Sequence, residues 1–315
     1  MSLPPPLKAR LTLPVIAAPM TAVSGFELVA ASCEAGVIGS FPVHNARREG
    51  TSGSLDAWLT ALDRRLSERD EPAAPFAPNL IMHRSNHHRD EELATLVAHR
   101  VPLVITSVGS PEAAVGPLHD AGSLIFADVA TLAHVDRCLD AGVDGLVLLT
   151  AGAGGQTGWM NPFAFVRAVR ARFDGTIVLA GGIGDGAAVL AAQALGADLA
   201  YLGTRFIAAQ ESLADDAYRA ALVSASLDDV VLSTAVGGLP ANLLREWIGR
   251  NVADVAEGDY RQDRLLGWND VWSAGHSVSS VQEVLPVREL VDQLLHEYDQ
   301  ARSAWQSQAD GAGKE

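Results

Sequence analysis

The sequence predicts an α/β protein built as a closed (β/α)8 TIM barrel, and three observations lead to this prediction. Short apolar runs alternate with helix-like runs along the first two thirds of the chain, and eight strand-like runs can be distinguished. Alternation of this kind is typical of a parallel sheet with helical crossovers. The last two strand-like runs each end in a turn that contains glycine, where barrels of this type commonly hold a phosphate.

The strand-like runs are short, apolar and rich in β-branched residues, as expected for strands covered on both faces. Turns rich in Gly, Pro or polar residues follow several of them. In chain order the predicted strands cover residues 11–20, 36–40, 75–81, 103–106, 124–127, 145–149, 176–180 and 197–202.

The intervening runs have helical spacing, most clearly at Leu55, Trp58, Leu59, Leu62 and Leu66. Ser24, Ser110 and Asp185 are expected N-caps, and Pro111 suits a first helical position. One helix begins after Ser24 and ends near residue 34, another begins at Ser110, and the others cover residues 54–69, 90–99, 132–140, 162–172 and 186–195.

An open, doubly wound sheet is the alternative architecture. Its dinucleotide-binding fingerprint requires spaced glycines in the first turn. This chain has Pro19 and Met20 there instead. We therefore favour the closed barrel, in which the chemistry lies at the carboxyl ends of the strands.

Beyond the eighth strand the alternation stops. Residues 215–226 and 239–249 indicate helices, 229–234 an extended run, and 251–269 are polar, whereas 286–302 are amphipathic and predict the last barrel helix. The predicted domain organisation is a barrel over 11–207 and 286–303, an inserted and mostly helical substrate or lid subdomain over 208–285, and a flexible tail over 304–315.

Composition limits the function classes. The net charge of −15 argues against a nucleic-acid surface, which needs a basic face. No apolar run reaches the length of a membrane span, and the first residues lack the basic and apolar regions of a signal peptide. Cys33 and Cys138 lie in apolar helical patterns and are expected to be buried free thiols. We expect a cytoplasmic protein that binds neither nucleic acid nor a membrane.

The two glycine turns are the strongest local signal. They read Leu179-Ala-Gly-Gly-Ile-Gly-Asp-Gly186 and Leu202-Gly-Thr-Arg-Phe206. Glycines let the backbone approach a ligand closely, and amides at a helix start favour an anion. A pair of ordinary turns is the alternative, but their spacing as one strand–helix–strand unit favours a phosphate site.

With these residues identified, the sequence resembles the nitronate monooxygenase (2-nitropropane dioxygenase-like) family of FMN-dependent barrels, to which flavin-dependent enoyl reductases are related. The motifs lie in order along the chain and are specific only jointly. They are Pro14–Met20, Gly36–Ser40, Pro78–Leu80, Ala151–Gly158, Ala180–Gly186, Ala194–Asp198, Gly203–Phe206 and Trp272–Gly275.

The resemblance implies FMN as the cofactor and assigns residues to it. Met20 matches a position beside the flavin ring, and Asn79 matches one that meets flavin atoms. Without the family, a core methionine and a turn asparagine are equally good interpretations of these two. Ser273 matches an active-site position after the insertion. The residues that match the phosphate cradle are Gly181, Gly182, Gly203 and Thr204, and Ala180 beside them is a further expected cofactor-binding residue.

One departure concerns the proton-transfer site. The family has a histidine in the sixth-strand loop that removes a proton from a neutral nitroalkane, whereas this chain has Gln156. A carboxamide does not take up a proton at ordinary pH. His44, His83 and His276 follow predicted strands or lie near Ser273, and His276 is the preferred replacement. No metal site is expected, because adjacent His87 and His88 lack further ligands at suitable spacing.

Three functions follow. The leading one is an FMN-dependent oxidoreductase that oxidises nitronate or a similar small carbanion-like substrate with O2. The second is a flavin reductase or dehydrogenase of an enone or acyl thioester that uses NAD(P)H. The third is a barrel that binds flavin or a phosphorylated ligand without turnover. Trp58 and Trp247, expected on helix surfaces, permit a homodimer.

Overall fold

The computed structural model describes residues 3–47, 54–236, 238–251 and 270–312. Its centre is a closed barrel of parallel strands in the order β1-β2-β3-β4-β5-β6-β8-β9. This confirms the predicted (β/α)8 architecture and excludes the open sheet. The barrel strands are β1 Val15–Ala17, β2 Ile38–Pro42, β3 Phe76–Ile81, β4 Leu103–Ser107, β5 Leu124–Val129, β6 Gly145–Leu149, β8 Thr176–Ala180 and β9 Leu199–Leu202.

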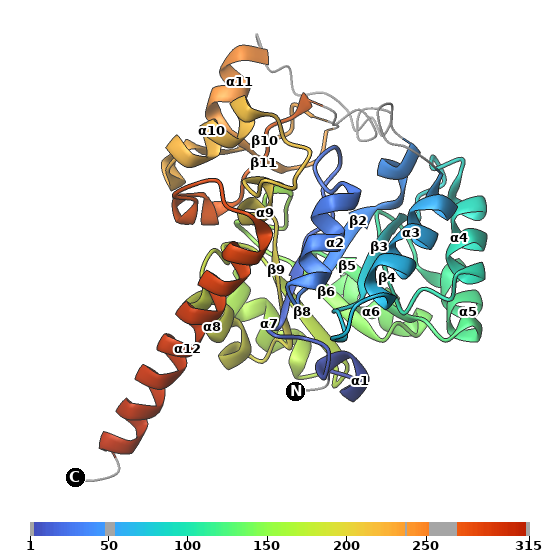
Figure 1. Cartoon of the computed structure of the whole chain (residues 1–315), viewed down its shortest axis with the longest axis horizontal. Helices are drawn as coiled ribbons and strands as arrows, with labels where there is room; N and C mark the ends of the chain where they lie inside the picture. The colour runs from blue at the N-terminus through green and yellow to red at the C-terminus, as the bar shows by residue number, and fades with distance from the viewer. Residues whose placement is uncertain (1–2, 48–53, 237, 252–269, 313–315) are drawn as a thin grey trace.

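Helices cover the outside of the barrel and follow the strands in turn (Figure 1). Apolar side chains on their inner faces pack against the outward side chains of the strands in one continuous core. The covering helices are α2 Phe26–Glu34, α3 Leu55–Ser67, α4 Arg89–Ala98, α5 Glu112–Ala121, α6 Leu132–Ala141, α7 Pro162–Arg170, α8 Gly186–Leu195 and, near the chain end, α12 Val287–Ala312.

The barrel interior is filled by a separate cluster of side chains, such as Phe126 and Leu199. Leu7, on the short helix α1 (Pro5–Lys8), belongs to this cluster and closes the amino-terminal end. Because side chains alternate along a strand, the residues two positions beyond Phe126 and Leu199 also point inward. These are Asp128 and Tyr201, and the barrel therefore presents polar groups at its carboxyl end.

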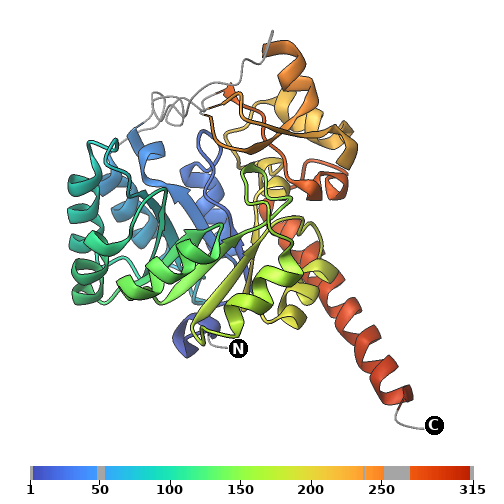
Figure 2. The same ribbon diagram turned by 180° about the vertical axis from the view of Figure 1, so that it is seen from behind.

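A second sheet lies beyond that carboxyl end. It joins β10 (Val230–Ser233), β11 (Ala241–Leu244) and β7 (Gly155–Gln156) in the antiparallel order β10-β11-β7. β7 belongs to the loop after β6, so a barrel loop and the later segment form one sheet. In Figures 1 and 2, β10, β11, α10 (Asp216–Ser224) and α11 (Arg245–Asn251) gather at one end of the barrel and α1 lies at the other.

α12 packs against α8 and α2, and its last turns project past the barrel in both views (Figures 1 and 2). Gly186 permits this contact, since a Cβ there would lie 2.1 Å from the backbone nitrogen of Tyr298. The last barrel helix therefore exists where residues 286–302 predict it. It also continues to Ala312, through most of the segment expected to be a tail.

Some local predictions need correction. Residues 241–244, expected to be helical, form β11, because they pair with β10 on one side and β7 on the other. Ser24 does not cap α2: Gly25 occupies that position, and the Ser24 hydroxyl donates to the Ala18 carbonyl instead. Pro111, not Ser110, is the N-cap of α5. The polar stretch 251–269 lies almost wholly outside the described residues.

Trp58 is also not the surface residue that was expected. Its side chain is only 4% exposed and packs between Phe26 and Phe41, with ring centroids 6.2 and 5.4 Å away. Trp247 is half-buried. Trp58 is therefore not an exposed residue that could support a homodimer. Within the described ranges, no helix combines the length and apolar character that crossing a bilayer requires.

Candidate active site

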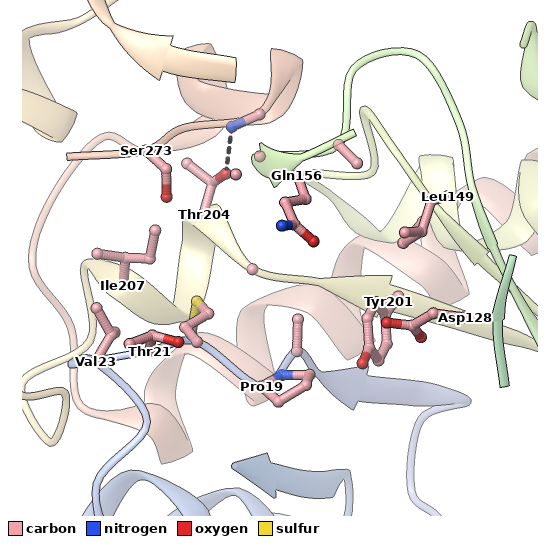
Figure 3. A pocket seen from close by; sticks show the side chains of 18 of the residues that line it. Pro19, Thr21, Val23, Asp128, Leu149, Gln156, Tyr201, Thr204, Ile207 and Ser273 are labelled. Atoms are coloured by element: carbon pink, nitrogen blue, oxygen red, sulfur yellow. Dashed lines mark hydrogen bonds between the residues drawn. The ribbon is translucent and has the colours of Figure 1, made fainter. Parts of the chain in front are cut away.

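A cavity opens at the carboxyl end of the barrel (Figure 3). Its floor consists of inward side chains at the carboxyl ends of the strands. Its walls come from the loops that follow the strands and from residues after β9. Nine of the ten predicted site residues line it: Met20, Asn79, Gln156, Ala180, Gly181, Gly182, Gly203, Thr204 and Ser273. The exception is His276.

The turn after β8 forms one wall. Gly181 and Gly182 have φ angles of +133° and +71°, which favour glycine. A Cβ on Gly182 would meet no atom within 4 Å, so this backbone borders open space. Asp185 then caps α8 by accepting a hydrogen bond from the Ala188 amide at 2.7 Å, as its sequence position predicts. The turn is rigid on its helix side and open on its cavity side.

The turn after β9 lies in the same cavity. Gly203 is followed by the short helix α9 (Thr204–Ile207), and both Gly203 and Thr204 line the space. The Thr204 hydroxyl accepts a hydrogen bond from the Gly275 amide at 2.9 Å. Arg205 points elsewhere: its guanidinium donates to the Ser280 carbonyl and, at 3.0 Å, to Gln293. Amides and a hydroxyl, not Arg205, form this part of the wall.

Two strand ends hold Met20 and Asn79 at the cavity. The Met20 loop is fixed because its amide donates to the Ser24 hydroxyl and its carbonyl accepts from Asn45, both at 3.0 Å. Asn79 accepts a hydrogen bond from the Ser107 hydroxyl at 3.0 Å. Its carboxamide NH2 has no partner among the described residues and can donate to a ligand.

Gln156 projects into the middle of the cavity from β7 (Figure 3). Its backbone pairs with Ala241 of β11, and Asn242 of the same strand donates to the Ala153 carbonyl at 2.7 Å. These two contacts hold the loop after β6 against β11. In the described structure the Gln156 carboxamide contacts no hydrogen-bond partner, so it is available to a bound molecule.

Ser273 faces the cavity from the segment that precedes the 3₁₀ helix His276–Ser280 (Figure 3). Its amide donates to the Tyr218 hydroxyl at 2.8 Å, and its carbonyl accepts from the same hydroxyl at 2.6 Å. Tyr218 in turn stacks on Trp272 with ring centroids 5.4 Å apart. The backbone around Ser273 is thereby fixed, while its hydroxyl points toward the cavity.

His276 does not join these residues. Its side chain is exposed and does not line the cavity, and its amide donates to the Gly152 carbonyl at 2.9 Å. Its ring lies against Gly152, since a Cβ built there would lie 2.9 Å from His276 Nδ1. That His276 replaces the missing histidine stays a prediction, which its place outside the lining does not favour. Of the nine histidines, only His44 occurs in the described lining, with Nε2 3.1 Å from the Thr21 hydroxyl.

Asp128 and Tyr201 are lining residues that the sequence reasoning missed. Burial raises the pKa of the Asp128 carboxyl to about 7. Burial, and the nearby Asp128 charge, hold the pKa of Tyr201 well above its ordinary value. A polar residue at the carboxyl end of a barrel strand is the signal that would have found them.

The cavity fits a flavin mononucleotide in chemical terms. Glycine turns beyond β8 and β9 border an open space that suits a phosphate. Small side chains, Ala18 and Ala180, lie on the floor among polar ones. Buried polar atoms of Asp128 and Tyr201 have no partner in the described structure, so they are free to meet a ligand. These features suit a ligand with a phosphate and a polar ring.

The chain is similar to known proteins over most of its length. The model of the nitronate monooxygenase family matches residues 6–297. A nitronate monooxygenase of Paraburkholderia phytofirmans is 27% identical, over 91% of this chain and 93% of the relative. A (3aS,4S,5R,7aS)-5-hydroxy-7a-methyl-1-oxo-octahydro-1H-indene-4-carboxyl-CoA dehydrogenase of Mycobacterium tuberculosis is 26% identical, over 74% of this chain and 63% of that protein.

Two solved structures share the whole architecture. FabK from Thermotoga maritima superposes with a TM-score of 0.77 at 26% identity, covering 94% of this chain and 96% of its own. Nitroalkane oxidase from Streptomyces ansochromogenes gives a TM-score of 0.76 at 25% identity, with 95% and 99% covered. The similarity therefore spans the barrel and the segments over its mouth.

Proposed function

The chain belongs to the nitronate monooxygenase family of oxidoreductases, and on this premise we propose that it binds FMN and oxidises nitronates or similar small carbanion-like substrates with O2. The observation that carries the proposal is one cavity wall made by two glycine turns. Gly181–Gly182 and Gly203–Thr204 follow neighbouring barrel strands and border the same space. Backbone amides so arranged suit the 5′-phosphate of FMN.

The surrounding residues suit distinct tasks toward that cofactor. Met20 and Ala180 offer apolar surface to a flat ring, and Asn79 offers donors to its polar atoms. Bound FMN would accept the electrons of the substrate, while the protein orients the substrate and limits access of water. Ser273 and Gln156 face the cavity from the side opposite the floor and are suited to contact the substrate itself (Figure 3).

Gln156 restricts the substrate class. A positioned general base typically contributes about 10²–10⁴-fold to a rate, or roughly 3–5 kcal/mol of barrier. A carboxamide supplies hydrogen bonds but no such proton transfer. We therefore propose that the protein acts on the pre-formed anion, with Gln156 donating to it, and reacts poorly with a neutral nitroalkane.

The segment over the mouth is proposed as a lid. Residues 208–285 contribute Tyr218, Val271 and Ser273 to the cavity lining, and β11 is paired to the sixth-strand loop through β7. The described residues of this segment therefore border the space that a substrate would enter. We propose this division, barrel and substrate-binding lid, as the working domain organisation.

A second candidate keeps the flavin and changes the electron partner. The relative from Mycobacterium tuberculosis is named as a dehydrogenase of a carboxyl-CoA compound. Together with the glutamine at the usual histidine position, this favours an enone or acyl thioester as substrate and NAD(P)H or NAD(P)+ as partner. In that reaction Gln156 would orient the thioester carbonyl.

One paired assay separates the candidates. Oxygen uptake is followed with propyl nitronate, and NAD(P)H consumption is followed with an enoyl thioester, using FMN-loaded protein. Uptake well above that of free FMN supports the nitronate reaction. Uptake equal to that of free FMN rules it out, and NAD(P)H consumption then supports the second candidate. Inactivity in both assays would favour a binding protein.

A further inference from the structure

The floor of the cavity carries two buried polar atoms that make no hydrogen bond to the described residues. Asp128 comes from β5 and Tyr201 from β9, and both side chains point to the barrel axis, where they lie close together (Figure 3). Asp128 Oδ1 and the Tyr201 hydroxyl are both enclosed and have no hydrogen-bond partner within the described chain. Tyr201 is only 8% exposed.

Unpartnered groups of this kind need an explanation, because a buried polar atom without a partner is costly and rare in native structures. Phenylalanine in place of Tyr201 would fill the same volume without that cost. Two such groups that line one cavity point to a ligand that supplies their partners. The polar edge of that ligand must reach the barrel floor.

The protonation states define what the pair can offer. Burial is the cause that raises the pKa of Asp128 to about 7, so its neutral form is well populated at neutral pH. The negative charge of ionised Asp128 also raises the pKa of two other groups, the Tyr201 phenol and the Cys138 thiol on α6. Burial keeps both uncharged, with the Cys138 pKa raised to about 11. The positive charge of Arg137 lowers the pKa of Cys138, whereas the pKa of Asp128 is shifted by burial.

A neutral carboxyl and a neutral phenol each donate one hydrogen bond. They therefore suit a ligand edge with neighbouring acceptors and disfavour one with neighbouring donors. The pyrimidine end of a flavin ring carries such acceptors at N1 and O2, and this edge gains negative charge when the ring is reduced. A carboxylate at the same place would repel it.

We propose that Asp128, in its uncharged form, and Tyr201 hold the pyrimidine edge of the flavin as a pair of hydrogen-bond donors on the barrel floor. This inference rests on the proposed FMN function. It adds that, above neutral pH, binding of FMN is coupled to the uptake of one proton by Asp128. FMN affinity therefore falls as Asp128 ionises.

The test measures the dissociation constant of FMN for the apoprotein between pH 6 and pH 9, by quenching of FMN fluorescence. If the uncharged form alone binds, the constant of the unmodified protein rises about tenfold per pH unit above pH 7, or about 100-fold by pH 9. The phosphate of FMN titrates near pH 6, so variants are compared at the same pH.

Three variants make the result specific. Asp128→Asn keeps the shape and a donor but cannot ionise, so its affinity should stay constant within about threefold from pH 7 to pH 9. Tyr201→Phe should weaken binding by about three- to tenfold at every pH and keep the slope. Asp120→Asn, on the exposed surface of α5, removes one negative charge elsewhere and should behave like the unmodified protein.

The outcomes are distinguishable. A flat profile in the unmodified protein, or the same slope in Asp128→Asn, overturns this inference while leaving FMN binding intact. Failure of every form to bind FMN at any pH overturns the proposed function and this inference with it. Should Asp128→Asn not fold, the slopes of the unmodified protein and Tyr201→Phe still decide the question.

Discussion

The Thr204 hydroxyl accepts a hydrogen bond from the buried Gly275 amide at 2.9 Å, across 71 residues of chain. This bond joins the turn after the last barrel strand to the segment that carries Ser273. The proposed phosphate site is therefore linked by a hydrogen bond to the segment of the proposed substrate-contacting residue. A change at Thr204 is expected to affect both stability and cofactor binding.

Thr204→Val should destabilise the protein by about 1–3 kcal/mol, because it leaves the Gly275 amide buried without an acceptor. Thr204→Ser keeps the hydroxyl and should cost less. Denaturant unfolding of the two variants measures the difference, and FMN affinity should fall in the same order. Equal stability of the Val and Ser variants would contradict the proposed coupling.

Gly182→Val should yield a protein that purifies without colour. Its φ of +71° disfavours valine, and the new side chain would enter the space assigned to the phosphate. Gly122→Val is the matched control, since Gly122 has a φ of +88° and an equally open Cβ position at the end of α5. Both variants carry the same backbone strain. A Gly182→Val protein that retains as much FMN as the control would contradict the cradle.

Gln156→His should restore proton abstraction. We expect the rate with neutral 1-nitropropane to rise at least about tenfold relative to the rate with propyl nitronate, toward the 10²–10⁴-fold typical of a positioned base. Gln156→Asn shortens the amide without adding a base and controls for lost contacts. Oxygen uptake with both substrates gives the ratio. An equal effect on the two substrates would show that Gln156 lies away from the proton-transfer position.

The stability of the apoprotein should depend on pH through Asp128. Its pKa is about 7 in the folded state and near 3.8 when unfolded, so the folded state holds the proton more tightly. Stability therefore falls as pH rises from about 4 to about 7 and then levels off, by up to about 4 kcal/mol in total. Asp128→Asn removes this loss, and its advantage in denaturant unfolding should be larger at pH 8 than at pH 5. An advantage that is constant with pH would contradict the shifted pKa.

Much of the barrel could be predicted from the sequence, because local patterns determine it. Asp185 caps α8, as its position indicates, and the helix ends at Leu195, as predicted. The strand at 176–180 matches β8 at both ends. The existence and order of the strands follow from these patterns, whereas some ends do not: the strand predicted over 11–20 is only Val15–Ala17.

The strands outside the barrel could not be predicted in this way. Residues 241–244 are a short apolar run that suits a helix or a strand equally, and only their pairing with β10 and β7 makes them a strand. The pairing with β7 joins segments 85 residues apart, as between Gln156 and Ala241. The spacing of residues along the sequence does not indicate a pairing between segments so far apart.

The site shows the same limit. Gln156, Asn79 and the glycine turns were found because they follow strands or match family motifs. Asp128 was missed because the predicted fifth strand ended at residue 127, whereas β5 continues to Val129. Two more residues of strand turn Asp128 into an inward side chain on the cavity floor. His276 shows the converse, since proximity in sequence to Ser273 does not place it among the lining residues.

The central claim, that this barrel holds FMN at the turns after β8 and β9, is tested most directly by the visible spectrum of the purified protein after incubation with excess FMN and gel filtration, followed by identification of the released flavin. The account predicts a flavin spectrum, one FMN per chain, and its loss in Gly182→Val but not in Gly122→Val. A colourless protein that retains no flavin would contradict it.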